Sequence, residues 1–189
     1  DPAEVGYGLG ASAGFVSTLI GVYVVTMAIG AFTLPVSSRV FGSRGALIVA
    51  CLLVATGYAL WLPFHDTTAQ ALINMGVAGV GSGALVAALP AAAAAAAPPH
   101  RTSFATGMTN ATKTVGGAIA SSIFAIALAA TGSLEGPAAG HAPLSGYLTV
   151  WSVCAVAALL AAASLVVVPK QAFSDHIEAR PSGRELTRP

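Results

Sequence analysis

The sequence predicts an all-α integral membrane protein, and two observations carry this prediction. The 189 residues are 56% hydrophobic and only 8% charged, whereas soluble domains carry about 25% charged residues. A chain so poor in charge needs a solvent that accepts apolar side chains, and a bilayer is such a solvent. The apolar residues also gather into runs long enough to cross a hydrocarbon core about 30 Å thick, which takes about 20 helical residues.

Five apolar runs qualify as membrane spans. They cover residues 13–34, 46–64, 69–89, 109–130 and 147–168. Backbone polar groups in lipid have to bond within their own segment, so each run is expected to be a helix. The shorter segments of alternating polarity that are typical of transmembrane barrels do not occur in the sequence. We therefore expect a transmembrane bundle within residues 1–169 and a disordered tail over residues 170–189.

Prolines are the expected ends of three of these helices. Pro35, Pro90 and Pro169 each follow an apolar run, a common stop signal. Seven consecutive alanines, residues 91–97, follow Pro90. Alanine is the best helix former, so this run could extend the third helix beyond the membrane.

All eight basic residues fall on one side of the expected bundle. They are Arg39, Arg44, Arg101, Lys113, Lys170, Arg180, Arg184 and Arg188. The opposite side carries acidic residues instead: Asp1, Glu4, Asp66 and Glu135. Because cytoplasmic loops hold an excess of Lys and Arg, we expect a multi-pass protein of the cell membrane with its N-terminus outside and its C-terminus in the cytoplasm.

Two stretches resemble the major facilitator superfamily. In RVFGSRGALIVACLLVATG, the order of Arg39, Gly42 and Arg44 before an apolar helix is similar to the short cytoplasmic loop between paired helices of that family. The family often has an acidic residue near the start of this loop, where this chain has Ser37 and Ser38.

The second stretch, PPHRTSFATGMTNATKTVGGAIASSIFAIAL, resembles the penultimate core helix of drug-efflux members. Its matching residues are Pro98, Pro99, Arg101, Gly107, Asn110, Lys113, Gly116 and Gly117. Arg is the usual residue where this chain has Lys113. The resemblance covers about residues 6–169. It implies that the five spans are the eighth to twelfth helices of a twelve-helix core, or their equivalents in a fourteen-helix member.

The resemblance also implies a function, namely that of a secondary active transporter that exports drug-like or amphipathic small molecules in exchange for protons. The chain would then be a C-terminal fragment whose partners are the lipid bilayer, a small-molecule substrate, protons and the missing N-terminal portion. No carboxylate lies within a span, so the proton-carrying acid is expected in that missing portion. Two alternatives stay open: a carrier of a metabolite, sugar or amino acid, or a membrane scaffold or accessory protein that transports nothing.

Five polar residues are candidates for the substrate path, because residues three and four apart share a helix face. Tyr23 and Thr26 lie near the middle of the first span. Asn74 is the one strongly polar side chain well inside the third, where its amide needs a partner in another helix or in a ligand. Asn110 and Lys113 lie on a polar stripe of the fourth. An ionisable group in a membrane indicates a functional site, although a lysine can also extend back to the interface.

Other parts of the sequence favour packing and lipid contact over chemistry. Gly79 and Gly83 form a GxxxG pattern, which suits close helix packing, and the glycines around them lack the features of a phosphate-binding loop. The second and fifth spans hold few polar residues and are expected to face lipid. Cys51 and Cys154 lie in apolar runs far from any histidine. We therefore expect no enzyme activity, no cofactor, no metal site and no nucleic-acid partner.

The charge distribution predicts the outcome of a labelling experiment. Cysteines introduced at Asp66 and Glu135, in a background where Cys51 and Cys154 are replaced by alanine, should react with a membrane-impermeant maleimide in intact cells. A cysteine at Ser43 should react only after the cells are permeabilised, since that loop carries the arginines. Labelling at position 43 with protection at position 66 would reverse the expected orientation.

Overall fold

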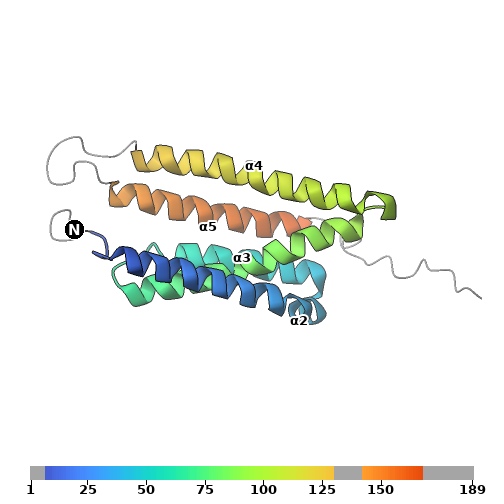
Figure 1. Ribbon diagram of the computed structural model, residues 1–189, viewed down its shortest axis with the longest axis horizontal. Coiled ribbons are helices and arrows are strands. Elements are labelled where there is room, and N and C mark those ends of the chain that lie inside the picture. Colours follow the sequence, from blue (N-terminus) through green and yellow to red (C-terminus); the bar gives the residue numbers. More distant parts are fainter. Residues whose placement is uncertain (1–6, 130–141, 168–189) are drawn as a thin grey trace, which may run out of the picture.

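The computed structural model describes residues 7–129 and 142–167. Within these ranges the chain is helical and contains no strand, as the composition predicts. The elements are α2 (Ala13–Ala59), α3 (Thr68–Ala96), the short 3-10 helix η1 (Pro99–Arg101), α4 (Thr102–Ala129) and α5 (Leu144–Val167). Four helical segments in the described part are long and apolar enough to cross a membrane. Figure 1 shows the long helices running along the longest axis of the molecule, with α4 beside α5 and α2 beside α3.

The prediction of five separate helices is matched only in part, because the first two predicted spans are joined in one element. The 47 residues of α2 would extend about 70 Å if they formed a straight helix. They do not, since Gly42 has a φ of 71° and a ψ of 163°. This backbone conformation is open mainly to glycine. The chain is helical on both sides of this one residue, which divides α2 into a first arm (residues 13–41) and a second arm (residues 43–59).

The two arms run along α3 in opposite directions. On the first arm, residue numbers increase in the same direction as those of α3, and on the second arm they increase in the opposite direction. The contacting pairs are Tyr23 with Gly79 and Met27 with Gly83 on the first arm, and Ala50 with Gly81 and Gly57 with Ala78 on the second. α3 therefore contacts both arms of α2 along its length.

Glycines bring these backbones together. A Cβ added at Gly81 would lie 2.6 Å from the carbonyl oxygen of Ala50, and one added at Gly57 would lie 2.5 Å from the amide nitrogen of Ala78. Gly79 and Gly83 face the first arm just as closely, which confirms the packing role predicted from the GxxxG pattern. Small residues are the usual means of close helix contact in membranes, where lipid offers no hydrophobic drive for association.

The expectation that the second span faces lipid is also wrong. Much of the described core comes from the second arm, where these residues are buried: Ala46, Leu47, Ala50, Cys51, Ala55 and Gly57. These side chains are apolar and mostly small. A span with few polar residues is equally suited to lipid and to the inside of a bundle, so its composition could not separate the two.

Two of the predicted helix ends are wrong as well. Pro35 lies inside α2 and Pro90 inside α3, because the backbone groups that a proline frees can be satisfied by neighbours in a membrane bundle. α3 runs to Ala96, which confirms that the alanine run extends the third helix. α4 begins at Thr102, seven residues before the expected start of the fourth span.

The connection between α2 and α3 is held by local hydrogen bonds and by an aromatic cluster. The Gln70 amide NH donates to the Thr67 hydroxyl (3.2 Å), and the Gln70 side-chain oxygen accepts from the Thr67 amide (3.1 Å), so the two residues form a capping box. Trp61, just after the end of α2, stacks on Trp151 of α5 with ring centroids 4.9 Å apart. This stack joins the end of α2 to the first half of α5.

At the opposite end of the bundle, Arg44 joins α2 to the last turn of α5. Its Nε donates to the carbonyl oxygen of Leu165 (2.6 Å) and its Nη2 to that of Val166. The last carbonyls of a helix have no partner within the helix and carry the negative end of its dipole. A guanidinium supplies both the hydrogen bonds and the positive charge.

This contact predicts a stability difference between the two loop arginines. Arg44→Ala should lower the melting temperature of the intact protein by several degrees, since charged hydrogen bonds worth about 1–2 kcal/mol are lost. Arg39→Ala is the matched control, because Arg39 is exposed and has no hydrogen bond or ion pair to the described residues. Equal melting of the two variants in detergent would show that Arg44 serves only as a topology anchor.

Candidate functional site

A cleft of about 660 Å³ lies between α2, α3 and α4. This volume falls within the range of sites that bind drug-sized molecules, about 300–1,000 Å³. On the α3 side, its wall is formed mainly by apolar residues at helical spacing: Leu85, Val86, Leu89 and Pro90. Tyr23 and Val54 contribute from the two arms of α2, and Ser82 adds a hydroxyl group from α3.

The α4 side of the cleft is polar. It consists of Thr109, Asn110, Thr112 and Lys113, next to Met108. The Thr109 and Thr112 hydroxyls already donate to carbonyls one turn earlier in α4, each at 2.9 Å. The side chains of Asn110 and Lys113 have no hydrogen-bond or ion-pair partner among the described residues. The cleft therefore combines an apolar wall on α3 with two polar side chains of α4 that can bind a ligand.

Three of the five substrate-path candidates meet in this cleft. Tyr23, Asn110 and Lys113 line it together, although the first is separated from the other two by more than 80 positions in the chain. The residues of the α3 wall were not among the candidates predicted from the sequence. A signal was available, since Ser82, Val86 and Pro90 follow one another at intervals of four residues, the spacing of one helix face.

Thr26 lies outside the cleft, in a packing contact. Its hydroxyl donates to the carbonyl oxygens of Val22 (2.8 Å) and Tyr23 (3.0 Å), and its side chain fills the space in front of Gly79. These contacts use the hydroxyl within α2 itself. They favour the packing role for Thr26 over a role in a substrate path.

Asn74 also lies outside the cleft. It is only 2% exposed, and its Nδ2 donates to the carbonyl oxygen of Phe64 at 2.8 Å. Phe64 belongs to the connection between α2 and α3, so the amide ties this connection to α3. The buried polar group has its compensating partner inside the bundle, which favours a structural role over the substrate-path role expected from the sequence.

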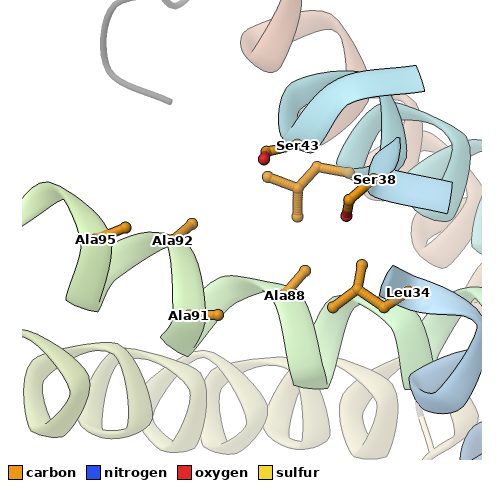
Figure 2. Close-up of a pocket in the computed structure, with 8 residues that line it drawn as sticks. Leu34, Ser38, Ser43, Ala88, Ala91, Ala92 and Ala95 are labelled. Carbon is orange, nitrogen blue, oxygen red and sulfur yellow. The ribbon is translucent and has the colours of Figure 1, made fainter. Parts of the chain in front are cut away.

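A second, smaller cavity of about 140 Å³ lies where the arms of α2 meet the alanine-rich end of α3. Figure 2 shows Ser38 and Ser43 across the gap from the alanine side chains of α3. Its lining is Leu34, Ser38, Ser43, Leu47, Ala88, Ala91, Ala92 and Ala95. None of these residues is charged, and the volume is below that of typical ligand sites.

These features define a multi-pass membrane protein with a cleft between its helices. A family model described as Major Facilitator Superfamily matches residues 2–187. The chain therefore belongs to the Major Facilitator Superfamily, a family of membrane transport proteins.

A solved structure gives the same fold. The chain is similar to the inward-open xylose transporter XylE from E. coli, with a TM-score of 0.67 and 17% sequence identity. The similarity covers 86% of this chain and 39% of the xylose transporter, so the chain spans well under half the length of that protein. No curated protein matches it by sequence.

The contact of Asn74 predicts how two asparagines should differ. Asn74→Leu removes the hydrogen bond between the buried Asn74 amide and the Phe64 carbonyl, at a cost of about 1 kcal/mol, so it should lower the melting temperature and reduce the transport of all cargo equally. Asn110→Leu should leave melting nearly unchanged and reduce polar cargo more than apolar cargo. Transport of a cargo panel by the complete protein and melting in detergent, both at matched expression, measure this. A normal melting temperature for Asn74→Leu, with an altered cargo profile, would return Asn74 to the substrate path.

Proposed function

We propose that the chain is the C-terminal part of a secondary active transporter that exports drug-like or amphipathic small molecules across the cell membrane. The observation that supports this most directly is the cleft between α2, α3 and α4. Its apolar wall suits the hydrocarbon body of such cargo, and Asn110 and Lys113 suit its polar end. The bundle has its N-terminus outside and its C-terminus in the cytoplasm, following the one-sided distribution of basic residues.

Protons are the proposed coupling ion, and the acid that carries them belongs to another part of the transporter. No carboxylate lines the cleft, and Asp66, the only carboxylate among the described residues, lies in the connection between α2 and α3, its side chain 78% exposed. Alternating access in this fold needs two halves that rock about a site between them. The cleft would therefore form one wall of the substrate path.

Sugar transport is the second candidate, because the similar solved structure is a xylose transporter. At 17% identity, this similarity supports the fold and leaves the cargo open. A sugar needs hydrogen-bond partners around most of its surface, whereas four neighbouring residues of the α3 wall are apolar. Amphipathic cargo is the better match to this lining. A scaffold without transport activity would have no need of the cleft.

Filling the cleft tests the proposal. Val86→Trp should reduce dye efflux by roughly tenfold or more, which corresponds to about 1.4 kcal/mol of lost cargo binding. Ile73→Trp is the control, because Ile73 is an exposed residue of the same helix that does not line the cleft. Efflux from cells is measured at matched expression, together with the melting temperature. Normal efflux by Val86→Trp would remove the cleft from the transport path.

A further inference from the structure

Lys113 is the only charged side chain in the lining of the cleft. It lies eleven residues after the first residue of α4, which places it about 17 Å along the helix axis. The carboxylate among the described residues, Asp66, belongs to the connection between α2 and α3 and does not line the cleft. The described part of the bundle thus holds a cation in the cleft without an anion to balance it.

The helix geometry directs this cation over the polar edge of the cleft. Long side chains on a helix lean back over the preceding turn, so the stem of Lys113 extends towards Thr109 and Asn110, which line the same cleft. The two threonine hydroxyls on this edge are already bonded to carbonyls of α4. On the α4 edge, the Asn110 amide and the Lys113 ammonium are the donors that remain available to a ligand.

A ligand with an apolar body and an anionic end matches both sides of the cleft. We propose that the cleft selects organic anions: Lys113 pairs with a carboxylate or sulfonate, Asn110 donates a hydrogen bond to it, and Leu85, Val86 and Leu89 contact the apolar body. This inference rests on the proposed transport function and names the cargo class. Lysine is a point charge with three rotatable donors, so the site accepts anions of different shape. An arginine keeps the positive charge and the N–H donors, so it should preserve the pairing.

The test is binding of two probes of nearly equal shape, 1-naphthaleneacetate and its neutral amide, 1-naphthaleneacetamide. The intact transporter in detergent at pH 7.4 is titrated calorimetrically as wild type, Lys113→Gln and Lys113→Arg. Wild type should bind the acid about tenfold more tightly than the amide, the gain expected of a charged hydrogen bond. Lys113→Gln should abolish this preference by weakening only the acid, and Lys113→Arg should retain it.

Three results would overturn the proposal. The first is that wild-type protein binds the acid no more tightly than the amide. The second is that Lys113→Gln still prefers the acid, and the third is that Lys113→Gln weakens the binding of both probes equally. The last result would mean that Lys113 pairs with a group of the protein. The transport function is judged separately by the Val86→Trp variant. If that variant loses dye efflux while the wild type binds the acid and the amide equally, the transport function is supported and the anion specificity is refuted.

Discussion

The close approach of α3 to both arms of α2 is the contact on which the rest of the bundle depends. Gly79 and Gly83 carry no side chain, so the first arm of α2 approaches the backbone of α3 closely at these positions. Gly81 allows the same close approach to the second arm. Moving an apolar side chain from lipid into a helix contact gains little free energy, because both environments are apolar. Dispersion contacts between closely packed backbones therefore drive the association of the helices. A methyl group at any of these positions would meet backbone or side-chain atoms of α2 closer than normal contact allows. The reversal at Gly42 makes this arrangement possible, because it returns the second arm along the same helix.

α4 shows what happens where such contacts are lacking. None of its residues is buried within the described part of the chain. A Cβ at Gly107, Gly116 or Gly117 would meet no atom of the described residues within 4 Å. α4 therefore stands apart from the tightly packed unit of α2 and α3. The cleft forms at this boundary, and its polar edge comes from α4 while its apolar wall comes from α3.

The sequence predicts the helices well and their contacts poorly, for a physical reason. Apolar length determines which residues lie in the membrane, so every described long helix overlaps a predicted span. The helix ends predicted at Pro35 and Pro90 were wrong, because proline ends helices less often in membrane bundles than in soluble proteins. Gly42 could not be distinguished from other glycines, since its positive φ is a property of the fold. Asn74 and Lys113 were both predicted as substrate-path residues because both are polar groups within a span. Only the structure distinguishes them, since the Asn74 amide is bonded to Phe64 and the Lys113 ammonium lines a cleft.

Arg44 and Lys113 carry the same formal charge but differ in their hydrogen-bond partners. The guanidinium of Arg44 is planar and carries several donors, and it binds two successive carbonyls at the end of α5. Its charge is partly balanced by the negative end of a helix dipole, so it contributes to the structure of the bundle. The ammonium of Lys113 has no such partner among the described residues. It belongs to the exposed helix of the cleft, where water can solvate it until a ligand replaces that water. Arg44 thus stabilises the bundle, because the unpaired carbonyls at the end of α5 lie within hydrogen-bond distance. Lys113 has no such helix end nearby among the described residues, so its charge remains available for binding.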